Sequence, residues 1–591
     1  MESNIRCPKE AAINRFPLTL SDVVVIVGYL VLVLYIGLYF RKRMHSAEDY
    51  FAGGHKVPWW LAGVSHYISS ASALSFVAYS QLGYTYGFVA ITVAWSAVPG
   101  CLLGGLVFAR RWRQARVSTP VEFLERRFNK FVRQLMAWAG IPMKIGEDGL
   151  KLFATSLFLS VGLQIPVSWA VLVCGAIAIA YTFFGGLWAL AVTDYVQFLM
   201  KALALLLLVP LACTAFWRAG GIHHAAAVFP PHFFHVTNGH YNWIYVAGFV
   251  AMLAITLNGS WALAQKYYSV ADTRQAEKAA YLSAALYFVG TPLMIVPAIL
   301  GRAFLPDLIA QHRTADVYVF LILRLLPAGM VGVVVAAMLS ATMAAVSADF
   351  SSIAGVITKD IYQRLLRPDT TPKGLLLVGK LITLLVGGLS VATALYLSMG
   401  GDQPILHLMV LIAGAFIAPS FLPLMGALVS RRLTSQGVIA GFFLGITSGL
   451  ALLGMRSWVL PHGYLPWLEE NYDGASLLIN TGMTVIGMWA GTLLSHATAR
   501  EGIKYDSIFS AGEQLRAPAP VGGRAIDLEK IISIATLAVA ALLAVAGLLA
   551  PSSAARATDL AIACCLAVLG WFRVRRTKMR PGSRSEVPTK V

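Results

Sequence analysis

The chain has 591 residues, of which 58% are hydrophobic and only 13% are charged. Soluble domains carry about 25% charged residues, so this composition excludes an ordinary soluble protein and indicates that lipid surrounds most of the chain. The net charge of +18 does not indicate a nucleic-acid partner, because the basic residues lie in short loops between apolar segments.

Apolar segments long enough to cross a bilayer follow one another along the chain. A membrane-spanning helix needs about 20 apolar residues, and the sequence predicts about fifteen such helices. They are expected at residues 20–40, 58–83, 87–109, 132–164, 166–185, 187–217, 242–264, 279–303, 318–347 continuing toward 363, 374–398, 404–429, 435–455, 475–497, 530–550 and 557–575.

The distribution of Lys and Arg predicts how these helices are oriented. Basic residues gather in alternate loops, for example in RKRMHS after the first span, in RRWRQAR after the third and in RVRRTKMRPGSR near the end of the chain. Loops of this kind face the cytoplasm, so we expect a multi-pass protein of the plasma membrane with its N-terminus outside and its C-terminus inside. The loop at 218–241 is poor in Lys and Arg and holds five histidines. Solvent exposure is the preferred interpretation of these histidines, and a metal site is the alternative.

Two of the predicted spans are interrupted by small and polar residues. Residues 58–83 contain SHYISSASALS, and residues 242–264 contain TLNGSWA. Helices broken near the middle of the membrane, at matching places in two halves of a chain, indicate a transporter binding site. The pattern therefore predicts an inverted repeat of five plus five helices, although helix packing through small residues would also explain the Ser and Gly.

The predicted repeat divides the chain into five parts. We expect an N-terminal extension with a peripheral helix at 1–50, a first five-helix repeat at 51–217, an extracellular loop at 218–241, a second five-helix repeat at 242–430, and peripheral helices at 431–591 that include a cytoplasmic linker at 498–529 and a basic tail.

Charged residues inside two spans need an explanation. Lys144, Glu147, Asp148 and Lys151 stand three or four residues apart, so they share one helical face. They form either a set of ion pairs inside the bundle or a site from which Lys151 is released to bind a charged solute. Asp194 lies in a later span, where a carboxylate costs about 3 kcal/mol at the membrane centre. It either faces a hydrated cavity and attracts a cation or pairs with a nearby donor.

Four stretches of the chain resemble the sodium/solute symporter family, whose members carry sugars, proline, iodide or sialic acid. They are YFAGGHKVPWWLAGVS, STPVEFLERRF, GGLWALAVTDYVQ and LPAGMVGVVVAAMLSATMAAVSADFSSIAGVITKDIY, and the resemblance extends from about Ala47 to Ser430. It implies an all-α integral membrane protein with a leucine-transporter-like inverted repeat. It also implies cation-coupled symport of a small organic solute by alternating access, without a cofactor.

The resemblance further implies a sodium site between the span at 58–83 and the span at 318–347. Three backbone carbonyls match the family's ligands, those of Ile68, Ala71 and Ala341. The family's two hydroxyl ligands match Ala344 and Ala345, which offer no oxygen. Losing two such ligands weakens sodium binding by a factor on the order of a hundred.

A displaced cation site is one way to replace the missing hydroxyls. Asp194 matches the family's aspartate near the cytoplasmic route of sodium, and Asp349 follows Ala345 by one helical turn. We hypothesise that the two carboxylates hold the coupling ion, either sodium or a proton. The alternative for Asp349 is simple solvation in the cytoplasmic mouth.

The solute is not identified by the sequence. Positions that bind sugar in sugar-carrying relatives match Ala94, Leu253, Thr256 and Leu411 here, so a sugar carrier is not expected. The pocket candidates combine aromatic faces with small hydrogen-bonding groups, and packing is the alternative for each: Ser72, Ser75, Trp95, Asn258 and Trp261, with Lys151 as the charged candidate.

A solute sensor on the same fold, acting through a partner protein, is the alternative function. No enzyme motif such as HExxH or GxSxG is present.

Overall fold

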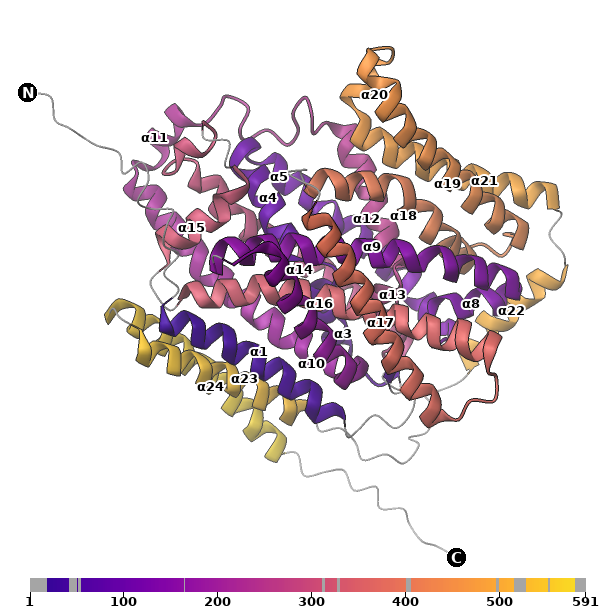
Figure 1. Cartoon of the computed structure of the whole chain (residues 1–591), viewed down its shortest axis with the longest axis horizontal. Coiled ribbons are helices and arrows are strands. Elements are labelled where there is room, and N and C mark those ends of the chain that lie inside the picture. The colour runs from indigo at the N-terminus through magenta and orange to yellow at the C-terminus, as the bar shows by residue number, and fades with distance from the viewer. Residues whose placement is uncertain are drawn as a thin grey trace, which may run out of the picture. The chain divides into compact units, whose positions relative to one another are not determined.

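The computed structural model describes residues 19–41, 50–51, 55–163, 165–310, 314–326, 330–399, 405–495, 499–514, 528–550 and 553–579. Within these ranges every regular element is a helix, apart from one isolated bridge between Val57 and Val270 (Figure 1). The all-α prediction is therefore confirmed. The predicted N-terminal extension, the second half of the linker and the end of the basic tail lie largely outside the described residues.

The chain divides into two compact units. The first comprises residues up to 32, residues 327–336 and residues from 518 onward. Its helices are the start of α1 (Leu20–Arg41), together with α23 (Leu528–Leu549) and α24 (Ser553–Met579), which pack along each other. In this unit Asp22 Oδ1 accepts a 2.7 Å hydrogen bond from the backbone N of Gly332. The carboxylate thus satisfies an amide in the first turn of α16 (Met330–Val356) that has no partner within its own helix.

The second unit comprises residues 33–326 and 337–517. The helices of its first half are α3 (Trp59–Ser69), α4 (Ala73–Tyr86), α5 (Val89–Trp95), α6 (Ala97–Leu103), the π-helix η2 (Gly104–Phe108), α7 (Ala109–Ala115), α8 (Pro120–Arg127), α9 (Lys130–Leu163) and α10 (Val167–Arg218). Residues 70–72 break the predicted span into α3 and α4, with Ser72 in an extended conformation. Helix α10 bends at Gly186, whose φ of 57° favours glycine. This bend is the predicted boundary between the spans at 166–185 and 187–217.

The helices of its second half are α11 (Gly221–Val228), α12 (Trp243–Gly259), α13 (Trp261–Tyr268), α14 (Thr273–Gly301), α15 (Val317–Leu325), the greater part of α16, the π-helix η5 (Ile357–Leu366), α17 (Pro372–Ser398), α18 (Ile405–Val429), α19 (Ser435–Trp458), α20 (Pro466–Glu470), α21 (Tyr472–Ser495) and α22 (Ala499–Gln514), with short 3₁₀ turns at 306–308, 314–316 and 460–462. Helices α12 and α13 meet at an angle of 55°, which confirms the break predicted in TLNGSWA. The prediction of one helix over 318–347 is wrong, because α15 ends at Leu325. Leu326 is extended and precedes a proline, which disfavours helical backbone at that residue.

Among the described residues, eleven helical segments are long and apolar enough to cross a membrane, and the bent pair α12–α13 makes twelve. The other three predicted spans, 58–83, 132–164 and 557–575, coincide with the broken pair α3–α4, with the charged helix α9 and with α24. The number of fifteen spans and the orientation of the termini stay predictions.

Helix α16 is the most deeply buried segment of the second unit. Every residue from Ala337 to Val356 is buried, and most of them are Ala, Ser, Gly or Val. Small side chains allow helices to approach closely within a membrane. Because buried charges must be paired, the carboxylate of Asp349 in this helix has to find its partners on neighbouring helices.

Candidate functional site

A cavity lies in the second unit between the α3–α4 break and helices α9, α12, α13 and α18. It measures about 1250 Å³, part of it open to solvent. One side carries the serines of the break, Ser69, Ser70, Ser72 and Ser75. Four charged residues also line the cavity: Lys144, Glu147, Lys151 and Asp349. Three of the predicted solute residues, Ser72, Ser75 and Lys151, therefore line this cavity together with the predicted carbonyl ligand Ala71.

The four charged residues form a closed ring of alternating sign. Lys144 Nζ lies 2.9 Å from Glu147 Oε2 and 2.9 Å from Asp349 Oδ1. Lys151 Nζ lies 2.8 Å from Glu147 Oε1 and 2.8 Å from Asp349 Oδ2. Each carboxylate thus bridges both ammonium groups. The side chains of Lys151 and Glu147 are 15% and 22% exposed, so these two members of the ring face the cavity.

Asp148 adds a third carboxylate to this ring. Its Oδ1 lies 3.3 Å from Lys151 Nζ, and the residue is fully buried. No described residue donates a hydrogen bond to its Oδ2. The predicted ion pairs of α9 are therefore present, and Asp349 of α16 completes them.

Asp194 has a separate set of partners behind the cavity wall. It lies on α10, and its Oδ2 accepts hydrogen bonds from the hydroxyls of Ser65 and Ser69 on α3. Lys266 of α13 places its Nζ 3.4 Å from the same oxygen. Asp194 is 1% exposed, and Oδ1 has no hydrogen-bond partner among the described residues. Asp194 and Asp349 thus belong to different networks, Asp194 with Lys266 and Asp349 with Lys144 and Lys151.

The positions that match the family's sodium ligands form an apolar junction. Ile68 and Ala344 pack together with Tyr67 in one buried cluster. Ala341 and Ala345 are also buried on α16. The side chains at these positions supply no oxygen, as the sequence predicts.

Three predicted pocket residues lie outside the cavity wall. The amide of Asn258 donates to the carbonyls of Gly100 and Ala254 at 2.9 and 2.8 Å. Trp95 donates through its indole N–H to the carbonyl of Phe288 at 3.0 Å, and Trp261 is 1% exposed. The contacts of Asn258 and Trp95 join neighbouring helices, which is the packing alternative stated for these residues.

Sequence reasoning did not identify Ser65, Lys266 or Lys201. All three are buried polar residues within helices of the transmembrane core. The two lysines carried a usable signal, because a charged side chain inside an apolar segment is rare and functional by default. For Ser65 no signal separates it from the other serines of the segment 58–83.

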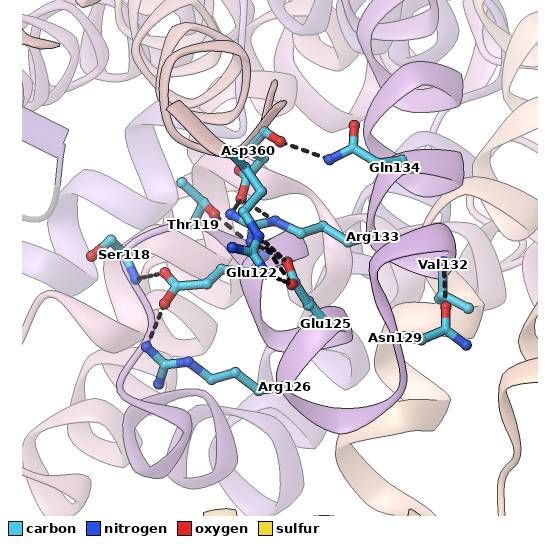
Figure 2. A network of polar contacts seen from close by, with 11 residues as sticks. Ser118, Thr119, Glu122, Glu125, Arg126, Asn129, Val132, Arg133, Gln134 and Asp360 are labelled. Carbon is cyan, nitrogen blue, oxygen red and sulfur yellow. Dashed lines mark hydrogen bonds and ion pairs between the residues drawn. The ribbon is translucent and has the colours of Figure 1, made fainter. Parts of the chain in front are cut away.

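A second polar network joins α8, α9 and η5, and Figure 2 shows it from close by. The guanidinium of Arg133 pairs with the buried carboxylate of Asp360 and with Glu125. Arg364 of η5 also pairs with Glu125, and Gln134 donates to the carbonyl of Asp360 at 2.7 Å. Partial burial raises the pKa of Glu125, but the two guanidinium groups outweigh this effect and hold that pKa below its ordinary value.

Comparison with known proteins identifies relatives over most of the chain. The model of the sodium:solute symporter family matches residues 50–445. The sodium/sialic acid symporter NanT of Aliivibrio fischeri is 24% identical over 79% of this chain and 93% of the relative. The sodium/glucose cotransporter of Vibrio parahaemolyticus is 25% identical over 74% of this chain and 85% of the relative.

A solved structure shows the same fold. It is described as the substrate-bound outward-open state of a Na⁺-coupled sialic acid symporter, and it superposes with a TM-score of 0.70 at 22% identity. The match covers 81% of this chain and 99% of that structure. The predicted leucine-transporter-like fold is confirmed.

Proposed function

We propose a coupling ion and a solute site for this chain on the premise that it belongs to the sodium:solute symporter family, a family of transporters rather than enzymes. The chain is a multi-pass membrane protein that carries a small organic solute together with a cation. The relatives reported above are named as symporters, and nothing about them supports the alternative of a transport-deficient sensor.

The proposed coupling ion is sodium, held at Asp194. Its buried Oδ1 has no hydrogen-bond partner among the described residues, whereas Oδ2 accepts from the hydroxyls of Ser65 and Ser69. These are hard oxygen donors around one negative charge, which suits a small cation. Asp349 is less suited, because each of its oxygens already lies within 2.9 Å of an ammonium group, whereas Lys266 pairs with only one oxygen of Asp194, at 3.4 Å. Asp194 therefore provides the coupling carboxylate in this proposal, in place of the pair hypothesised from the sequence.

The proposed solute site is the cavity beside the α3–α4 break. Broken helices offer backbone groups and small hydroxyls to a ligand at mid-membrane, and Ser72 and Ser75 fulfil that role here. Lys151 and Glu147 of α9 offer one positive and one negative group to the same cavity. The single observation that carries the proposal is this cavity, whose mainly apolar wall carries both the serines of the α3–α4 break and the charge ring. The solute is therefore polar and carries an anionic group that takes Lys151 from Glu147.

The membrane potential is sufficient to drive such a transporter. A potential of 100 mV supplies about 2.3 kcal/mol per net charge that crosses. This corresponds to about fiftyfold accumulation when one cation crosses with a zwitterionic solute.

Counterflow in proteoliposomes tests the proposed solute site. A panel of anionic, zwitterionic and neutral polar metabolites is exchanged across the membrane with sodium chloride or choline chloride on both sides. We expect one anionic or zwitterionic class to exchange, with a lower apparent affinity in S72A. The matched control is S457A, at an exposed serine of α19, which should leave exchange unchanged. Exchange of a neutral sugar, or equal effects of the two variants, would contradict the proposed site.

A further inference from the structure

A lysine with no role in the proposed mechanism lies at the α3–α4 break. Lys201 is on α10, and the residue is 4% exposed. Its Nζ lies 4.5 Å from the ring centre of Tyr67 and 5.3 Å from that of Phe76. Tyr67 is in the last turn of α3, and Phe76 is in the first turn of α4. The ammonium group therefore sits against both sides of the break.

Within the described ranges, no carboxylate neutralises this ammonium group. Among the described residues, no Asp or Glu oxygen lies within the 4.0 Å of an ion pair with Lys201. Two other features favour a positive charge at this place. The faces of aromatic rings attract cations, and the C-terminal end of a helix such as α3 carries a partial negative charge.

On α16, the side chains at the two positions that match the family's hydroxyl ligands contain no oxygen. Ala344 and Ala345 of α16 stand at the two positions where the family resemblance places hydroxyl ligands, and both are buried. Ala344 packs against Ile68 and Tyr67, and Tyr67 is the residue on which the Lys201 ammonium lies. The residues at this junction do not fit a sodium ion.

We infer that the ammonium group of Lys201 takes the place of the metal cation at the α3–α4 break. The absence of the two hydroxyl ligands and the presence of the buried lysine are then linked, because the ammonium group replaces the cation that the hydroxyls would bind. The charge that stabilises the broken helix belongs to the protein, and it does not leave with the solute. Two unit positive charges about 5 Å apart repel each other enough to weaken the binding of a cation on the order of a hundredfold.

This inference concerns the break and is independent of whether Asp194 binds sodium. The two ideas are separated by measuring binding of ²²Na⁺ to the purified full-length chain in detergent, with Asp194→Asn as the background. We expect wild type to bind one sodium ion per chain and D194N to bind none.

Two substitutions should create the missing site only when the lysine is also removed. In the D194N background, A344S/A345S with Lys201 retained should still bind no sodium. Adding K201A should produce binding of one sodium ion per chain. K201R in place of K201A keeps the positive charge and should abolish that binding again. K201A alone, without the two serines, should bind none.

Two results would overturn the inference. One is sodium binding by D194N/A344S/A345S as tight as that of the same variant with K201A. The other is a second sodium ion in wild type that survives in D194N. By contrast, D194N binding as much sodium as a wild type that binds one ion would refute the proposed coupling site. Thermal midpoints in choline chloride show which variants fold, and K201M or K201Q replaces K201A if that variant does not. If no such variant folds, the wild-type and D194N counts decide together. One ion in wild type and none in D194N supports the inference, and two ions in wild type with one surviving in D194N overturns it.

Discussion

Replacing Lys151 with methionine tests the charge ring of the cavity most severely. In the wild type two ammonium groups face three carboxylates, of which Asp148 and Asp349 are buried, and Lys151 contacts all three. K151M leaves the single ammonium of Lys144 to face them. Removing one partner of a buried ion pair costs about 3–5 kcal/mol, so we expect the free energy of unfolding to fall by about that amount.

A second substitution should restore much of this stability. K151M/D349N leaves one ammonium group and two carboxylates, which returns the cluster to the net charge of the wild type. Residues in one such network show coupling energies of about 0.5–3 kcal/mol. Unfolding of the purified chain by SDS in mixed micelles measures these differences, with K373M at an exposed lysine as the control. Unchanged stability of K151M, or a double variant less stable than K151M, would refute the ring as described.

Three further predictions concern parts of the molecule outside the cavity. R133M removes a buried guanidinium and should lower the free energy of unfolding by about 3–5 kcal/mol. The side chain of Arg364 is 52% exposed, so R364M should change this free energy by less than about 1 kcal/mol. Equal effects of the two variants in thermal unfolding would contradict the network of Figure 2. The pKa of Glu125 is lowered in the folded protein. The stability that Glu125 contributes is therefore complete above its unfolded pKa of about 4.3 and is lost as the pH falls through the folded pKa. E125Q should flatten the acid side of a plot of unfolding free energy against pH, and an unchanged plot would contradict the pairing. G487A places a methyl carbon 2.7 Å from the carbonyl oxygen of Ala440 and should destabilise the folded chain by about 1–3 kcal/mol. The methyl group of G482A, on the same helix, meets nothing within 4 Å. G482A should therefore be neutral or slightly stabilising in the same thermal assay.

Local patterns were sufficient to predict the breaks in the helices. The run of serines after His66, the sequence TLNGSWA and the Gly-Gly pair before Leu187 each predict a place where the backbone cannot continue as a regular helix. The structure has a break or bend at all three places. The extent of the α16 segment was predicted less well, because a long apolar run does not show where one helix stops and the next begins.

Partners on different helices could not be predicted from spacing. The i,i+3 and i,i+4 rule paired Lys144 and Lys151 with the acids of their own helix, but nothing in it indicates that Asp349, about two hundred residues later, closes the ring. The same limit applies to Asp194. Its charge inside an apolar run predicts a functional or paired carboxylate, whereas its actual partners, Ser65 and Lys266, depend on how α3, α10 and α13 pack.

The sequence shows alanine at the two positions that match the family's hydroxyl ligands. It does not show that Lys201 lies beside the α3–α4 break. Lys201 follows Asp194 by seven residues and lies in a run of apolar residues. Only the packing of α10 against the α3–α4 break brings its ammonium group to the rings of Tyr67 and Phe76. A missing ligand can thus be predicted from the residue type alone, but its replacement by a side chain from another helix cannot.

The measurement that tests coupling through Asp194 most directly is solute accumulation in proteoliposomes with an inward sodium gradient, using whichever metabolite shows counterflow. We predict that the wild type accumulates this solute above its external concentration only when sodium is present, and that D194N exchanges it without accumulating it. Accumulation by D194N equal to that of the wild type, or wild-type accumulation as high in choline as in sodium, would contradict the account.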